Sequence, residues 1–123
     1  MITIYGELYS SKNHRQVFRS GGKIIIAKPA KAKAQEKDHA IQLQAGKVRW
    51  NKMVVGKAYP LRVGFRVYRK TNGAFDWCNI IQGLADAMTK AGYFPDDSAK
   101  YFTPVFLGFD KDAQNPRTEI EVL

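Results

Sequence analysis

One predicted amphipathic helix, which begins after Asp76, constrains this chain more than any other feature. Apolar residues recur there with the 3.6-residue period of a helix that buries one face, at Trp77, Ile80, Ile81, Leu84, Ala85 and Met88. Asp76 stands at the N-cap position, and Gly92 and then Pro95 stand where such a helix ends. The pattern therefore predicts a helix with a carboxylate at its start and two more, Asp96 and Asp97, on a return segment after its end.

Length and cysteine content favour one intracellular domain. The 123 residues suffice for a single domain, 1–123, with a hydrophobic core that needs no disulfide. Cys78 is the one cysteine, so no internal disulfide can form, which fits a reducing cytosol. The N-terminal residues do not resemble a signal peptide, and no apolar run is long enough to cross a bilayer. We expect a soluble cytoplasmic protein without a membrane partner.

Charge is distributed unevenly along the chain. Residues 1–75 carry 16 Lys and Arg against 3 Asp and Glu, a net +13, whereas residues 76–123 carry 4 against 8, a net −4. A basic half suits a polyanion such as DNA, and a carboxylate-rich half suits a hard metal ion. A solvated basic surface with a chance asymmetry is the alternative interpretation.

The remaining pattern predicts an α+β fold with the element order β-β-β-α-β-α-β-β. Strands are predicted at 2–8, at 17–18 and 24–26 as a hairpin turned at the glycines, and at 61–68, 101–109 and 118–123. A first helix with a thin apolar face is predicted from Ala30 across the edge of a sheet, and 46–59 reads mostly as loop. Pro104 predicts an edge strand or a bulge. This order packs most simply as a mixed sheet with both helices on one face.

The carboxylates and one amide suggest a Mg²⁺ site. Asp76 and Asn79 are three residues apart and share the first turn of the predicted helix. Mg²⁺ needs only a few protein oxygens, which Asp76, Asp97 and Asp96 would supply, and such an ion can orient and activate water for phosphodiester hydrolysis. The structural alternatives are a plain N-cap for Asp76 and a turn for the Asp96–Asp97 pair.

Cations and polar residues in the basic half are candidate phosphate contacts. The candidates for DNA binding are Lys12, Asn13, Arg15, Lys23, Lys28, Lys31, Lys33, Arg66 and Lys70. Such contacts give affinity without reading sequence, and a solvated basic face is the alternative for each of them. The chain has no P-loop, GxGxxG or CxxC motif, so neither a nucleotide cofactor nor a zinc site is expected.

One segment, residues 76–97, resembles the signature of the RusA family of Holliday junction resolvases. Its sequence is D-W-C-N-I-I-Q-G-L-A-D-A-M-T-K-A-G-Y-F-P-D-D. That signature is Asp-x-Asp-Asn-Leu-x-Lys, a helix with Asp-Ala-Leu, then Gly, an aromatic residue and Asp-Asp. The similarity runs without gaps over about a fifth of the chain, and the loop S-S-K-N-H-R looks like the family's Asn-bearing loop after the first strand.

The resemblance implies a homodimeric, Mg²⁺-dependent endonuclease, with Mn²⁺ a possible substitute, that resolves branched DNA in recombination and repair. It assigns metal binding to Asp76, Asn79 and Asp97, with Asp96 beside them, and by analogy a phage or mobile-element origin.

Two positions depart from the family pattern. Cys78 replaces the second Asp, and Gln82 replaces the lysine. A thiol is a poor ligand for a hard cation, and Gln lacks the positive charge of lysine. Asp96 is a candidate replacement for the missing carboxylate, and Arg66 or Lys70 for the missing charge. The departures leave open a catalytically weak or inactive relative that binds branched DNA, and the composition leaves open a basic nucleic-acid module without metal.

Overall fold

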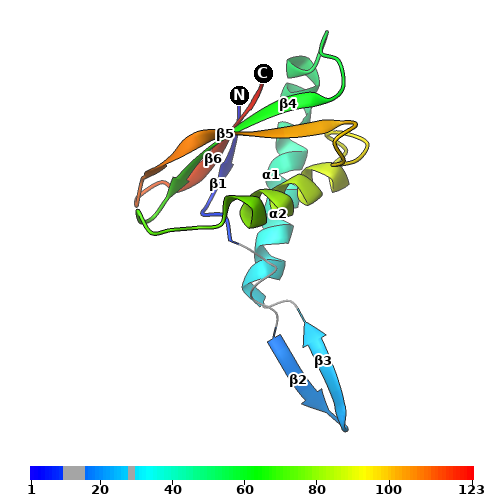
Figure 1. The fold of residues 1–123 in the computed structure, drawn as a ribbon, viewed down its shortest axis with the longest axis vertical. Helices are drawn as coiled ribbons and strands as arrows, with labels where there is room; N and C mark the ends of the chain where they lie inside the picture. Colours follow the sequence, from blue (N-terminus) through cyan, green and yellow to red (C-terminus); the bar gives the residue numbers. More distant parts are fainter. Residues whose placement is uncertain (10–15, 28–29) are drawn as a thin grey trace.

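The computed structural model describes residues 1–9, 16–27 and 30–123 (Figure 1). Within these ranges the elements follow the predicted order. They are β1 (Ile2–Tyr5), β2 (Gln16–Ser20), β3 (Lys23–Ala27), α1 (Ala30–Met53), β4 (Leu61–Arg69), α2 (Trp77–Lys90), β5 (Phe102–Lys111) and β6 (Arg117–Val122).

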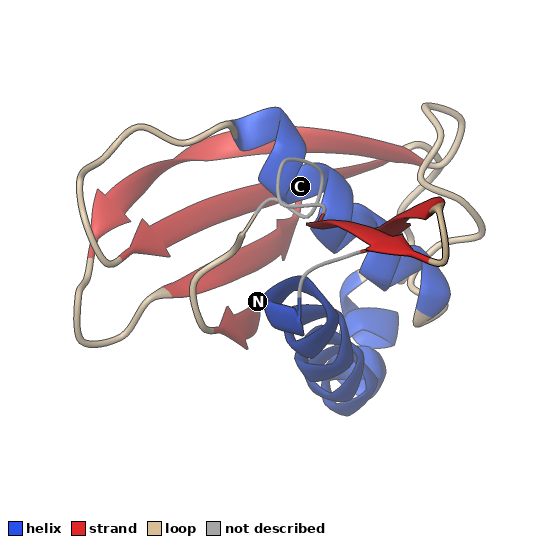
Figure 2. Ribbon diagram, turned by 90° about the horizontal axis from the view of Figure 1, so that it is seen from below, coloured by secondary structure: helices blue, strands red, loops and turns tan. Residues whose placement is uncertain are grey.

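Four strands form one mixed sheet in the order β1-β6-β4-β5. β4 and β5 run parallel and are joined through α2, whereas β6 pairs antiparallel with both β1 and β4. The alternating apolar residues of β4 all point to one face and are at most 4% exposed: Leu61, Val63, Phe65 and Val67. Both helices lie on this face, with α2 crossing the sheet and α1 toward β1 (Figures 1 and 2). The predicted α+β architecture is confirmed.

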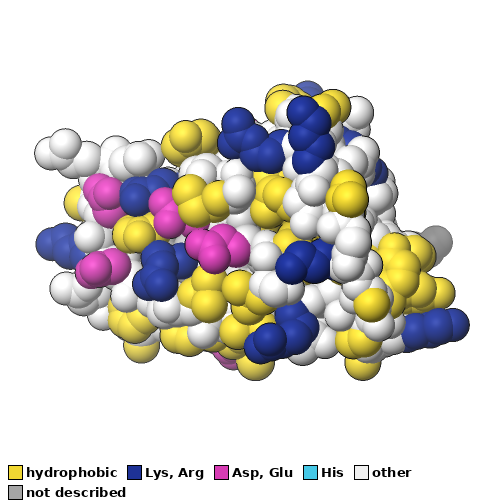
Figure 3. Space-filling model, turned by 90° about the horizontal axis from the view of Figure 1, so that it is seen from above, with side chains coloured by type: hydrophobic (Ala, Val, Ile, Leu, Met, Phe, Trp, Pro, Cys, Tyr) yellow, Lys and Arg dark blue, Asp and Glu magenta, His cyan; other side chains and the backbone are white. Residues whose placement is uncertain are grey.

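The other face of the sheet carries charge. Arg62 and Arg66 of β4 and Glu121 of β6 are exposed, in alternation with the buried residues of the same strands. Figure 3, viewed from the side opposite to Figure 2, shows acidic and basic side chains intermingled with apolar ones. The β4 arginines therefore point away from the helices.

The β2–β3 hairpin turns at Gly21 and Gly22, as predicted, and forms a two-stranded sheet that is separate from the main sheet in the part of the chain that the structure describes. Figure 1 shows the hairpin extending away from the main sheet and the helices. β5 pairs only with β4, so the edge position predicted from Pro104 is also confirmed.

The prediction of a loop over 46–59 is wrong in its first half, because α1 continues to Met53. Gly46 suggested a break, yet it permits close packing inside the helix. A Cβ built at Gly46 would lie 2.8 Å from Tyr93 Oη and 3.4 Å from a methyl carbon of Ile2. The glycine therefore lets α1 approach the core without a steric clash, which no periodicity in the sequence indicates.

Two glutamines attach α1 to the segment that begins with β1. Gln42 accepts a hydrogen bond from the Tyr5 amide (2.7 Å) and donates one to the Tyr5 carbonyl (2.9 Å). Gln35 forms the same pair of bonds with Tyr9 (2.8 and 3.1 Å). These side chains satisfy backbone groups along an edge of the sheet, so α1 holds its position there although its apolar face is thin.

Replacing Gly46 with Ala is expected to destabilise the protein by about 1–2 kcal/mol, despite the better helix propensity of alanine. The new methyl would displace Tyr93 Oη, which donates a 2.6 Å hydrogen bond to the buried Leu43 carbonyl. Urea denaturation followed by circular dichroism measures the change. Gly83→Ala in α2 is the matched control, because no atom lies within 4 Å of its added Cβ; it should gain roughly 0.5–1 kcal/mol. Equal gains for both variants would contradict the packing argument.

Candidate functional site

Asp76 caps the N-terminus of α2. Its Oδ1 accepts a hydrogen bond from the Asn79 amide N–H (3.2 Å), and its Oδ2 accepts one from Asn79 Nδ2 (3.0 Å). Both oxygens are therefore oriented by one residue, and the carboxylate remains exposed. The predicted N-cap is confirmed, as is the proximity of Asp76 and Asn79; their role as metal ligands stays a prediction.

The far end of α2 is held by a different set of contacts. Gly92 has a φ of +79°, its N–H donates to the Thr89 carbonyl, and the Tyr93 N–H donates to the Met88 carbonyl, which is a Schellman motif. Lys47 Nζ donates to the carbonyls of Ala91 and Gly92, a favourable position for a cation at a helix C-terminus. The predicted end of the helix is confirmed.

Asp96 and Asp97 follow this end, so α2 separates them from Asp76. Both side chains are exposed, and Asp96 Oδ1 accepts a hydrogen bond from the Asp97 amide (2.9 Å). The 14 residues of α2 span about 21 Å at 1.5 Å per residue. One ion binds oxygens about 2.1 Å away, a distance far shorter than the length of α2. Among the described residues, no group of three or more His, Cys, Asp or Glu side chains could hold a metal ion.

Cys78 and Gln82, which depart from the family pattern, are both exposed on α2. Cys78 lies in the first turn, two residues from Asp76, and Gln82 one turn later. A shallow, open hollow of about 600 Å³ is lined by residues 74–78, including Asp76 and Cys78. These positions therefore present a thiol and an amide to solvent where the family pattern has a carboxylate and an ammonium group.

The predicted phosphate contacts separate into distinct regions. Lys12, Asn13, Arg15 and Lys28 lie outside the described residues, and Lys23 is described only as the first backbone position of β3. Lys31 and Lys70 line one hollow of about 500 Å³ beside Glu7 and Asp38, and Lys31 Nζ lies 3.6 Å from the ring centroid of Tyr9. Lys33 is exposed on α1. Arg66 points to the sheet face opposite α2, so it does not lie with the other candidates.

Four aromatic residues form a cluster at the start of α2, and this cluster was not predicted. Phe75 and Trp77 flank Asp76 in the sequence, and Phe109 and Phe106 of β5 contact them. The Phe75 and Phe109 ring centroids are 5.1 Å apart at 82°, and those of Trp77 and Phe106 are 4.8 Å apart at 61°. Such edge-to-face contacts are favourable and hold the rings in place. Side chains three residues apart on a regular strand point to opposite faces, so the sequence does not indicate that Phe106 and Phe109 lie on the same side.

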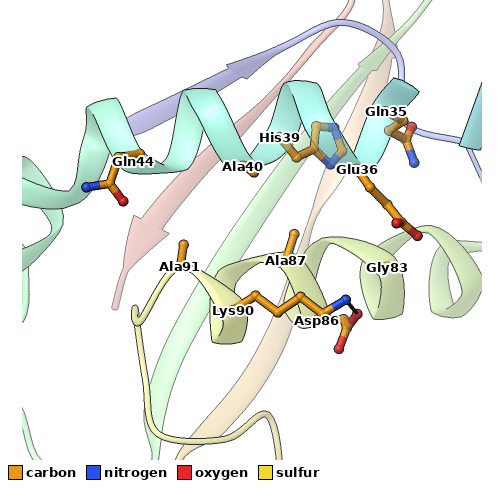
Figure 4. Close-up of a pocket in the computed structure, with 10 residues that line it drawn as sticks. All are labelled: Gln35, Glu36, His39, Ala40, Gln44, Gly83, Asp86, Ala87, Lys90 and Ala91. Atoms are coloured by element: carbon orange, nitrogen blue, oxygen red, sulfur yellow. Dashed lines mark ion pairs between the residues drawn. The ribbon is translucent and has the colours of Figure 1, made fainter. Parts of the chain in front are cut away.

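A pocket of about 220 Å³ lies between α1 and α2 (Figure 4). The sequence pattern did not predict this pocket either. Small residues, Ala40, Gly83 and Ala87, line it, and polar side chains from both helices surround them, among them Asp86 and Lys90, which form a 3.1 Å ion pair.

His39 lies in this pocket and is 4% exposed. Burial lowers the pKa of its imidazole from the usual 6.5, while the charge of Asp38 acts in the opposite direction. His39 is therefore neutral in the folded protein at neutral pH.

Acidification should weaken the fold through His39. In the unfolded chain the imidazole binds a proton as the pH falls through about 6.5, whereas in the folded chain it does so only at a lower pH. The free energy of unfolding should thus fall as the pH drops from about 7.5 to about 5.5, above the range where ordinary carboxylates titrate. Urea midpoints at several pH values measure this slope. His39→Gln should flatten it, and an unchanged slope in that variant would exclude His39 as the cause.

Among the described residues, no helix is both long enough and apolar enough to pass through a bilayer. Comparison with known protein families and with proteins of curated function finds no match to this chain.

Proposed function

We propose that this protein is a metal-dependent, structure-selective DNA endonuclease that cuts four-way junctions or other branched DNA. The observation that carries the proposal is the segment 76–97. It has the first carboxylate, the amide, a helix and the closing Asp-Asp of the RusA-like pattern in the same order, with Cys78 in place of the second Asp. Its helix α2 is capped by Asp76 and is followed by Gly92. The strongly basic N-terminal half supports a polyanionic substrate.

The proposed active site needs two copies of the chain. In one copy, Asp76 precedes α2 and Asp97 follows it, and the 14 residues of α2 rise about 21 Å along the helix axis. A second copy related by a two-fold axis, with its α2 antiparallel to the first, would bring Asp97 of the partner subunit toward Asp76. Such an axis generates two equivalent sites, which suits paired nicks in strands of like polarity at a symmetric junction.

The metal ion, the amide of Asn79 and two lysines would each have a different role in cleavage. A bound Mg²⁺ or Mn²⁺ would supply charge neutralisation at the scissile phosphate and activation of water. Asn79 holds the Asp76 carboxylate through two hydrogen bonds, so this acceptor is already oriented. Lys31 and Lys70 contribute phosphate affinity, which is independent of base sequence.

Cleavage of a labelled synthetic four-way junction, compared with a duplex of matched sequence, tests the proposal. We expect symmetric nicks in the junction with Mg²⁺ or Mn²⁺, none with EDTA, and none in the duplex. The absence of both binding and nicking under all of these conditions would overturn the proposal.

A second function, binding of branched DNA without cleavage, is favoured by one observation. Cys78 and Gln82 are exposed in the first half of α2, where the RusA pattern has an Asp and a Lys. Among the described residues, no group of three or more His, Cys, Asp or Glu side chains could hold a metal ion. Tight junction binding with no nicking in either metal would establish this accessory role in recombination or repair.

A further inference from the structure

The aromatic cluster beside Asp76 presents two rings to solvent. Phe106 is 45% exposed and Phe109 is 46% exposed, although both are large apolar side chains. Phe106 makes an edge-to-face contact with Trp77, and Phe109 makes one with Phe75. Trp77 in turn contacts the ring of the buried Phe65, with centroids 6.0 Å apart at 62°. The exposed rings are therefore anchored to the core.

A β-bulge in β5 brings these two rings to the same side. The β4–β5 register pairs Phe65 with Phe106 and Arg66 with Gly108, so Leu107 is the extra residue. In a regular strand Phe106 and Phe109 would point to opposite faces, because they are three residues apart. Gly108 has a φ of +117°, a conformation that other residues rarely adopt, and so it permits the bulge. Bulges of this kind redirect side chains, and they occur often beside functional sites.

Cations and carboxylates both lie at the rim of the cluster: Asp110 directly follows Phe109 and is exposed, and Arg69 is paired with Glu7 at 3.7 Å. The Arg69 guanidinium lies 4.6 Å from the ring centroid of Phe75, at the end of β4. Lys111 is paired with Arg69 in the β4–β5 register, and Lys70 directly follows Arg69 in the chain; both lysines are exposed. Half-exposed aromatic faces next to cations match the chemistry of nucleic acid, in which planar bases alternate with phosphates.

We propose that Phe106 and Phe109 form a stacking platform for a nucleobase that is unstacked at the branch point of the DNA. This inference rests on the proposed function and identifies how the same site would select its substrate. Bases in a continuous duplex already stack on their neighbours, whereas a base at a branch can turn onto an aromatic face. The platform contacts Phe75 and Trp77, the two residues that flank Asp76, so a base held there would bring its backbone phosphate to the start of α2. The exposed Lys70 and Lys111 at the rim would bind the flanking phosphates.

The experiment uses the full chain and a four-way junction with 2-aminopurine at the branch point. The double variant Phe106→Ala/Phe109→Ala removes both rings, and Phe106→Leu/Phe109→Leu keeps apolar area but removes the π faces. Tyr59→Ala is the matched control. Tyr59 is 55% exposed and makes its own edge-to-face contact with Tyr101 (5.1 Å, 88°), but it precedes β4, at the end of the strand opposite to Asp76. Thermal melting verifies that each variant folds.

We expect wild type and Tyr59→Ala to quench the 2-aminopurine fluorescence on binding. Both double variants should lose this quenching and bind the junction roughly tenfold or more weakly, with unchanged duplex affinity. Unchanged quenching in the folded alanine double variant, with a junction-binding wild type, would overturn the platform and leave the proposed function intact. If the alanine double variant is a monomer where the wild type is a dimer, and its quenching is unchanged, the platform is also overturned. The rings would then belong to an interface between two copies of the chain. Absence of junction binding by the wild type would instead refute the proposed function.

Discussion

Replacing Asp76 with Asn is expected to abolish junction cleavage, by at least about 100-fold, and to leave junction binding intact or tighter. The substitution removes a negative charge that a metal ion requires and that repels phosphate. It keeps the side-chain oxygen that caps α2, because Asn is as good an N-cap as Asp. Initial nicking rates and gel-shift affinities on the same junction measure the two effects. An equal loss of binding and cleavage would contradict a role for Asp76 in the chemistry.

The matched control for this variant is Asp86→Asn. Asp86 is an exposed carboxylate of the same helix, and its ion pair with Lys90 is a surface contact of little energetic weight. It lies between Asp76 and Asp97 along α2 and should leave the nicking rate unchanged.

Mixing two inactive variants tests whether the active site is shared between copies. Asp76→Asn and Asp97→Asn should each be inactive alone, yet a mixed dimer would contain one site with both carboxylates intact. Random mixing should therefore restore single-strand nicking at roughly a quarter of the wild-type sites. No recovery in a mixture that demonstrably exchanges subunits would exclude the shared site, because a site within one chain stays defective in every combination.

Replacing Trp50 with Ala should destabilise the fold by about 3–5 kcal/mol, the largest stability loss that we expect from a single substitution. Trp50 is fully buried, its Nε1 donates a 2.8 Å hydrogen bond to the Tyr93 carbonyl, and its ring lies 4.9 Å from Tyr93 and 6.4 Å from Phe94. The alanine variant leaves both a cavity and a buried carbonyl without its donor.

Urea denaturation measures this loss, with far-ultraviolet circular dichroism as the signal. Trp50→Phe is the informative control, since it retains most of the volume and loses only the donor; it should cost about 1–3 kcal/mol. A loss below about 1 kcal/mol for Trp50→Ala would show that α1 does not depend on this contact.

Local patterns of residues suffice to determine α2 and β4. The stripe from Trp77 to Met88 has a single face that can be buried, and Asp76 and Gly92 stand at its ends. Alternation along β4 likewise allows only one buried face. These features are readable because each depends on residues that are neighbours in the sequence.

Contacts between segments that are distant in the sequence determined two other features, the place of Gly46 within α1 and the shared side of Phe106 and Phe109. Gly46 belongs inside α1 because Tyr93, 47 positions later, packs against it, and a single sequence shows only a helix breaker. Phe106 and Phe109 share a side because β5 slips by one residue against β4, which the spacing of the two residues hides.

For the candidate site, too, some features follow from the local sequence and others only from the tertiary structure. The sequence by itself determined which carboxylates flank α2, since capping and turn chemistry are local. Only the tertiary structure decided that the rings of Phe106 and Phe109 pack against the residues that flank Asp76. It also decided that, among the described residues, no group of three or more His, Cys, Asp or Glu side chains could hold an ion. The physical reason is that a helix is rigid along its axis: it fixes the distance between its ends, whereas its surroundings depend on the strands that pack beside it.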